Sequence, residues 1–239
     1  QFFCDIHLGL QRLTNYKIVS QIRRELADKL NIDSLEQVLY NHWSPYIGSK
    51  SQITVDATCY ESELRYPTPQ KLLWEAVDWL YGQLKKTCKI IGVKMIRTKY
   101  LKWKKRYFGY SKMRRKTNKK RKPLTRALLH LLGKLIAFEK ELRDTNKLNF
   151  TVTYYRRVAT IKKVHIQQQE YFGTGKSPKN RIVSIQKDYL RPIVRGKEVK
   201  PVEFGAKVNK LQIDGINFIE HLSFNAFNEG TRLKSTVYK

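Results

Sequence analysis

The chain has 239 residues, of which 41% are hydrophobic and 12% aromatic, so its composition excludes a disordered tail and allows one large domain or two small ones. It carries 48 Lys and Arg against 20 Asp and Glu, a formal net charge of +28. A folded chain with this excess needs a polyanion as partner, because self-repulsion otherwise opposes compaction. We expect nucleic acid in that role, with an anionic membrane surface as the alternative.

The sequence gives the membrane alternative little support. The longest apolar stretch, Ala127–Phe138, is interrupted by His130, Gly133 and Lys134 and is too short to span a bilayer. The first residues show no secretory signal, and the three cysteines lack the spacing of a disulfide or metal motif, which suits a reducing compartment. We therefore expect a cytoplasmic protein without a membrane partner.

Two helices and a strand are predicted in the amino-terminal quarter. Apolar residues at four-residue intervals predict an amphipathic helix over residues 15–30. The motif Ser34-Leu35-Glu36-Gln37 has the pattern of a capping box and predicts that a second helix begins there. After the breaks at Pro45 and Gly48-Ser49, the run at residues 52–58 predicts a strand.

Helices are predicted from residue 68 to about residue 170. Thr68-Pro69 is a favourable N-cap followed by proline at the first helical position, and Gly92 is expected to end that helix. A basic helix follows, and Pro123 is expected to separate it from a helix over residues 124–143. A further helix is predicted over residues 154–170.

The last third of the chain has the pattern of short strands. Apolar runs at residues 181–185, 191–197 and 202–213 predict strands, and residues 216–224 predict another. Between the last two, Asp214-Gly215 is a strong hairpin signal. A second catalytic acid is the alternative role for this Asp, but the turn explains it without chemistry.

This order of elements predicts an α+β fold in which the first strand of a sheet is followed by a large basic helical insertion. We divide the chain into a helical segment over residues 1–50, the first core strand and turn over 51–66, the insertion over 67–175 and a β-hairpin region over 176–239.

Positive charge is concentrated in the middle of the chain, where no carboxylate occurs from Trp79 through Phe138. A solvated surface is the ordinary explanation of a charged run, but a run of this length without acids favours phosphate contacts. Each neutralised phosphate releases counterions, so binding should weaken steeply with salt. The cations that we predict to contact DNA are Lys102, Lys104, Lys105, Arg106, Lys112, Arg114, Arg115, Lys116, Lys119, Lys120, Arg121 and Lys122.

Aromatic residues alternate with these cations. Tyr100, Trp103, Tyr107 and Tyr110 follow the spacing i, i+3, i+7, i+10, which places them on one face of a helix. Stacking on exposed bases is one interpretation, but we favour packing against neighbouring helices.

Asp56 is the main candidate for chemistry. It follows the β-branched run Ile53-Thr54-Val55, and a strand holds a metal-binding carboxylate with little slack. The alternative is that Asp56 only caps a turn.

Nine blocks occur in one order along the chain: Val55–Ser62, 65–68, Lys71–Glu75, Arg181–Ser184, 191–197, Val202–Lys207, 214–215, Phe218-Ile219 and Asn225–Glu229. Together they resemble the DDE transposases of bacterial insertion sequences. The resemblance implies an incomplete RNase H-like sheet with Asp56 on its first strand, as the first of three carboxylates that hold two Mg²⁺ ions. It also implies DNA partners (transposon ends and target), a homodimer on paired ends, and a nucleoid-associated protein of the bacterial cytoplasm.

The sequence departs from this family in its later carboxylates. Asp188, Asp214 and Glu229 precede the region where the family carries its second Asp and its Glu, and Glu61 and Glu63 fit an exposed turn better. One carboxylate cannot hold a pair of Mg²⁺ ions. We therefore expect the amino-terminal portion of a transposase, which binds DNA without cutting it. The alternative is a non-catalytic basic nucleic-acid-binding protein, in which the strand-end Asp is structural.

Overall fold

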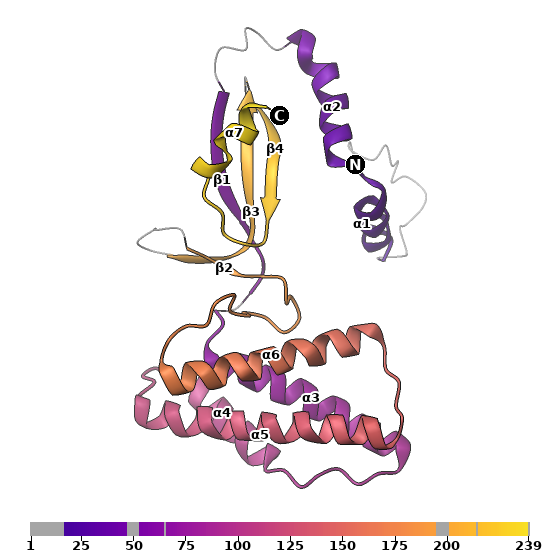
Figure 1. Cartoon of the computed structure of the whole chain (residues 1–239), viewed down its shortest axis with the longest axis vertical. Helices are drawn as coiled ribbons and strands as arrows, with labels where there is room; N and C mark the ends of the chain where they lie inside the picture. The colour runs from indigo at the N-terminus through magenta and orange to yellow at the C-terminus, as the bar shows by residue number, and fades with distance from the viewer. Residues whose placement is uncertain (1–16, 47–52, 65, 195–200, 214, 239) are drawn as a thin grey trace, which may run out of the picture. The chain divides into compact units, whose positions relative to one another are not determined.

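The computed structural model describes residues 17–46, 53–64, 66–194, 201–213 and 215–238, which form an α+β fold (Figure 1). The chain order is α1 (Ile18–Lys29), α2 (Ile32–Trp43), η1 (Ser44–Tyr46), β1 (Ile53–Glu61), α3 (Pro69–Ile91), α4 (Tyr100–Ser111), α5 (Asn118–Thr145), α6 (Val152–Thr174), β2 (Pro192–Val194), β3 (Val202–Ile213), β4 (Ile216–Ser223), η2 (Gly230–Arg232) and α7 (Leu233–Val237). None of the helices in these ranges is long and apolar enough to cross a membrane.

The chain divides into two compact units, one of residues 1–55 with Leu211–Phe218, the other of Asp56–Lys210 with Ile219–Lys239. Both predicted helices of the first unit are present, but the predicted start of the second at Ser34 is wrong. α2 begins at Ile32, and the side chain of Asn31 accepts a hydrogen bond from the Ser34 N–H (3.1 Å). Asn is at least as good an N-cap as Ser, so the earlier residue takes the role.

The predicted ends of α3 are confirmed. The side chain of Thr68 accepts a hydrogen bond from the Lys71 N–H (3.3 Å), and Pro69 occupies the first turn. At the other end, Gly92 adopts a left-handed conformation (φ +70°), which favours glycine because a side chain is strained there. Because these local signals are satisfied, α3 keeps its full 23 residues.

The prediction that Pro123 separates two helices is wrong, since α5 begins at Asn118 and continues through it. Proline removes one intrahelical hydrogen bond, but Pro123 lies in the second turn, so the loss falls near the exposed end of a 28-residue helix. The residues that follow, including Leu124 and Leu128, are buried and hold the helix in place.

Four helices of the second unit share one hydrophobic core. α3 packs against α5 and α6, and α4 packs against α5. Leu73, Leu80, Leu132 and Ile161 are completely buried where these helices meet. These residues form the core of a helical bundle.

β3 is the central strand of a four-stranded sheet and pairs with β1, β2 and β4. It pairs antiparallel with β2, with Ile193 opposite Glu203. Only Pro192–Val194 forms a strand within the predicted run 191–197, of which residues 195–197 lie outside the described ranges. The hairpin between β3 and β4 turns at Gly215 (φ +87°); Asp214 also lies outside those ranges.

The strand predicted at residues 181–185 is absent from the described structure, where this run is irregular. Ile182 packs into the helical core, whereas Val183 packs into a small second core with Leu190 and Phe204. In place of a hydrogen bond to a neighbouring strand, the Ile182 N–H donates to the side chain of Gln167 (Oε1, 3.0 Å). An apolar run of this length looks the same for a strand and for a buried connector.

A buried charge network joins the carboxyl-terminal residues to the sheet. Glu220 of β4 accepts two hydrogen bonds from the Arg232 guanidinium (2.6 and 3.0 Å) and one from the Asn209 amide (2.9 Å). The Glu220 side chain is only 3% exposed. The hydrogen bonds from Arg232 lower the pKa of Glu220 from its ordinary 4.5 to about 2.

Because of this network, we expect part of the free energy of unfolding to depend on pH in the acidic range. Because the folded pKa of Glu220 is lowered, its contribution is complete above the unfolded pKa and is lost as the pH falls from about 4.5 toward about 2. We expect Glu220→Gln to lower the free energy of unfolding by about 2 kcal/mol at neutral pH. The difference in free energy of unfolding between wild type and variant, measured by urea denaturation, should become smaller below pH 4.5.

Glu229→Gln is the matched control, because Glu229 is exposed and pairs with Lys207 at the surface. Its effect should be below about 1 kcal/mol. If the difference in free energy of unfolding between wild type and Glu220→Gln stays constant down to about pH 2, the lowered pKa of Glu220 is contradicted.

Candidate nucleic-acid interface

α4 presents one aromatic face to the core and one cationic face to solvent. Tyr100 and Tyr110 are 9% and 6% exposed, and Trp103 and Tyr107 are half-buried against the bundle. The preference for packing is therefore confirmed for Tyr100 and Tyr110, which are buried in the helical core.

Stacked rings fix this helix on α3. Trp74 of α3 stacks on Tyr107 with ring centroids 5.1 Å apart, and Tyr81 stacks on Tyr100 at 3.8 Å. The Tyr100 hydroxyl donates a hydrogen bond to Asp78, and burial raises the pKa of this tyrosine above its ordinary value. These ring contacts hold α4 against α3.

All twelve predicted cations are exposed. They fall into three groups: Lys102, Lys104, Lys105 and Arg106 on α4; Lys112, Arg114, Arg115 and Lys116 between the helices; and Lys119, Lys120, Arg121 and Lys122 in the first turns of α5. Within the described parts of the chain, none of the twelve forms an ion pair with a carboxylate. We call these twelve residues the cationic surface.

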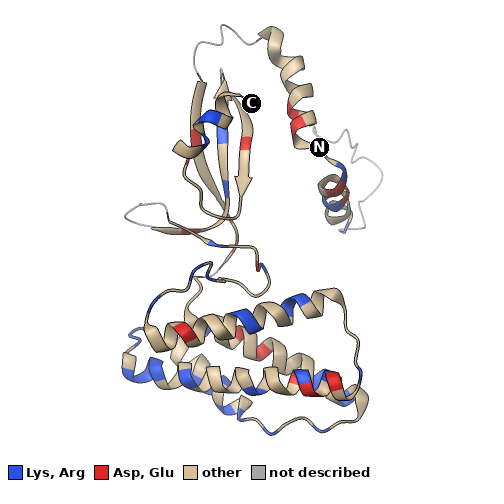
Figure 2. Ribbon diagram, viewed as in Figure 1, with Lys and Arg blue, Asp and Glu red and all other residues tan. Residues whose placement is uncertain are grey.

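Carboxylates of the bundle lie elsewhere, on α3, on α6 and toward the far end of α5 (Figure 2). The amino-terminal end of a helix carries a partial positive charge, so Lys and Arg in the first turn of α5 are electrostatically unfavourable for folding. A bound polyanion would relieve this repulsion. The arrangement is therefore better suited to binding than to stability.

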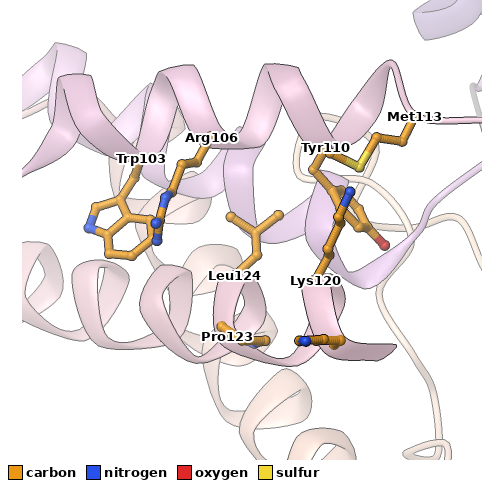
Figure 3. A pocket seen from close by; sticks show the side chains of 8 residues that line it. Trp103, Arg106, Tyr110, Met113, Lys120, Pro123 and Leu124 are labelled. Atoms are coloured by element: carbon orange, nitrogen blue, oxygen red, sulfur yellow. The ribbon is translucent and has the colours of Figure 1, made fainter. Parts of the chain in front are cut away.

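A pocket of about 310 Å³ opens between α4 and α5. Its lining consists of Trp103, Arg106, Tyr110, Met113, Lys119, Lys120, Pro123 and Leu124. In Figure 3 the Trp103 and Arg106 side chains extend toward α5, and Leu124 lies between that pair and Tyr110. The sequence alone does not reveal this pocket, because its lining comes from two helices. One of the lining residues, Leu124, has the sequence pattern of an ordinary core residue.

Asp56 lies inside β1, in the same sheet as the β3–β4 hairpin, and its side chain is exposed. The next residue, Ala57, is buried on the opposite face. The expectation that Asp56 ends a strand or caps a turn is wrong, because β1 continues to Glu61. Glu61 and Glu63 are exposed, but the predicted turn is wrong for Glu61, which is the last residue of β1; only Glu63 lies beyond the strand.

Two other carboxylates considered from the sequence serve structural contacts. Asp188 pairs with Arg156 (2.6 Å), whose hydrogen bonds lower the pKa of this carboxyl. Glu229 pairs with Lys207 (3.0 Å). Neither lies in a cluster suited to a metal: among the described residues, no three His, Cys, Asp or Glu side chains come together.

The described residues therefore do not fit a pair of Mg²⁺ ions. Two such ions need several oxygen ligands, and Asp56 belongs to no group of three or more His, Cys, Asp or Glu side chains in the described part of the molecule. We derive no catalytic step from this site.

Comparison with protein-family models, with curated proteins and with solved structures finds no match for this chain.

Proposed function

We propose that this chain binds DNA through the cationic surface of α4, the following loop and the first turns of α5. The observation that carries the proposal is the exposure of twelve cations that make no ion pair with the described carboxylates. The stretch Trp79–Phe138 holds twenty Lys and Arg and no acid, so most of the net charge of +28 comes from a quarter of the chain. Phosphates are the ligands that such a surface attracts most strongly.

We further propose that the chain is part of a DDE transposase, with the bundle inserted into an incomplete RNase H-like sheet and Asp56 as the first metal-binding carboxylate. Two features support this class. Asp56 lies on β1, which pairs with β3, the central strand of the sheet, and four helices separate β1 from β2 in the chain. A non-catalytic nucleic-acid-binding protein remains the alternative, and it uses the same cationic surface.

The proposal of DNA binding is tested by titrating the chain into a fluorescently labelled duplex at several salt concentrations. The logarithm of the binding constant should fall linearly with the logarithm of the salt concentration, with a slope of about −0.9 for each phosphate contacted. Binding that is absent, or that does not depend on salt, would overturn the proposal.

The class is tested by an assay for nicking of supercoiled DNA in Mg²⁺. Because Asp56 belongs to no group of three or more metal-binding side chains among the described residues, we expect the 239-residue chain to leave the DNA intact. Mixed with a polypeptide that supplies the missing carboxylates, it should gain Mg²⁺-dependent nicking that Asp56→Ala abolishes. Robust nicking by the chain alone, lost in Asp56→Ala, would contradict our account of the site.

A further inference from the structure

We infer that the pocket between α4 and α5 accepts one unpaired base, so that the cationic surface binds single-stranded DNA in preference to the duplex. This inference rests on the proposed DNA binding and specifies the form of DNA that the surface recognises.

The pocket has the size and lining that a base requires. Its volume of about 310 Å³ is at the lower end of the range of roughly 300–1,000 Å³ for small-ligand sites, enough for one ring system. Leu124 and Tyr110, which are 5% and 6% exposed, form its apolar floor and one wall. Such a cavity excludes water from the faces of a planar ligand.

The opposite wall offers a flat cationic surface. The Arg106 guanidinium lies over the Trp103 ring, 5.3 Å from its centroid. Guanidinium planes and indole rings both stack on nucleobases, and this stacking depends little on the identity of the base. Trp103 and Arg106 therefore provide an attraction that a paired base in a duplex cannot reach.

The rim of the pocket carries charge of a single sign. Arg106, Lys119 and Lys120 are exposed there, and no carboxylate is among the lining residues. A base inserted in the pocket would leave its phosphates at this rim. The expected ligand is thus a nucleotide of a DNA strand, because its base enters the pocket and its phosphates contact the cationic rim. An uncharged aromatic compound would occupy the pocket without contacting the rim.

The test compares a single strand with a duplex of the same length. Single strands release fewer counterions for each phosphate contacted, so electrostatics alone favours the duplex. We expect the wild-type chain to bind the single strand more tightly than the duplex. A single strand carrying 2-aminopurine should also show a fluorescence change as its base becomes stacked in the pocket.

Arg106→Gln and Lys105→Gln form a matched pair, since both remove one exposed cation from α4 and only Arg106 lines the pocket. Arg106→Gln should weaken single-strand binding about 10-fold more than Lys105→Gln, with equal small losses on the duplex. Trp103→Leu should act as Arg106→Gln does, whereas Phe108→Leu, at an exposed aromatic outside the pocket, should not. The thermal melt of each variant verifies folding.

Equal effects of the Arg106 and Lys105 variants on both forms of DNA, with the duplex bound more tightly, would overturn this inference and leave the proposed function standing. Absence of salt-dependent binding to either form would overturn both. Because Arg106 is exposed, its replacement does not disturb the core, so the matched pair decides the question even if Trp103→Leu unfolds.

Discussion

Replacing Lys119, Lys120, Arg121 and Lys122 together with glutamine is expected to weaken duplex binding by about 100-fold or more at about 0.1 M salt. These four residues are exposed in the first turns of α5, and they are the densest part of the cationic surface. Each lost phosphate contact lowers the slope of the salt dependence by about 1, so the slope should fall by up to about 4. Fluorescence anisotropy at several salt concentrations measures both quantities.

The same replacement should not destabilise the bundle. Removing cations from the amino-terminal turn of α5 relieves an unfavourable interaction with the helix dipole, so the midpoint of urea denaturation should stay constant or rise slightly. The loss of affinity should also be similar for unrelated duplex sequences, because phosphates carry no sequence information. A loss confined to one sequence would point instead to base recognition by these side chains.

A second set of four replacements provides the control for net charge. Lys140, Lys163, Lys176 and Lys179 are exposed cations outside the cationic surface, and their change to glutamine removes the same charge. We expect a reduction of affinity below about 10-fold, since distant charges are screened over roughly 10 Å at this salt concentration. Comparable losses from the two sets would show that total charge, and not this surface, drives binding.

The second large effect is expected at Gly205, where β3 approaches β1 most closely. A Cβ atom at this position would overlap the Tyr60 carbonyl oxygen and lie 2.9 Å from the Glu61 Cα. Next to it, the Ser62 N–H donates a hydrogen bond to the Phe204 carbonyl (2.8 Å). Both contacts are with backbone, so no side chain can move aside, and any larger residue must separate the two strands.

We therefore expect Gly205→Ala to lower the free energy of unfolding by about 3 kcal/mol, and Gly205→Val to prevent stable pairing of β1. Urea denaturation measures the first effect, and hydrogen exchange of the β1 amides measures the second. Gly82→Ala is the matched control, because a Cβ there meets nothing within 4 Å and the residue lies inside α3. That change should stabilise the chain by about 0.5–1 kcal/mol. A neutral Gly205→Ala would contradict the close strand contact.

Several elements follow from the sequence because their signals are local. The N-cap at Thr68 and the left-handed Gly92 mark the ends of α3 from neighbouring residues alone. The spacing of Tyr100 and Tyr110 likewise predicts the buried face of α4. Capping and helical periodicity act over one or two turns of chain, so no distant partner can change them much.

Other predictions were wrong at positions where the local sequence is compatible with two different structures. Residues 181–185 have the apolar pattern of a strand, but their backbone groups find side-chain partners such as Gln167, and the run becomes a buried connector. Pro123 reads as a helix boundary, yet the buried residues after it keep α5 continuous on both sides. In each case the packing of distant segments selected between alternatives that the local sequence leaves open.

The sequence by itself determined the charge, the helical periods and the position of Asp56 on a strand, since these depend on residue identity and spacing along the chain. Only the tertiary structure decided that Trp103, Tyr110 and Leu124 line a pocket, and that Asp56 belongs to no group of three or more metal-binding side chains among the described residues. The physical reason is that cavities and ligand clusters are built by side chains far apart in sequence. Their distances are set by the packing of whole elements.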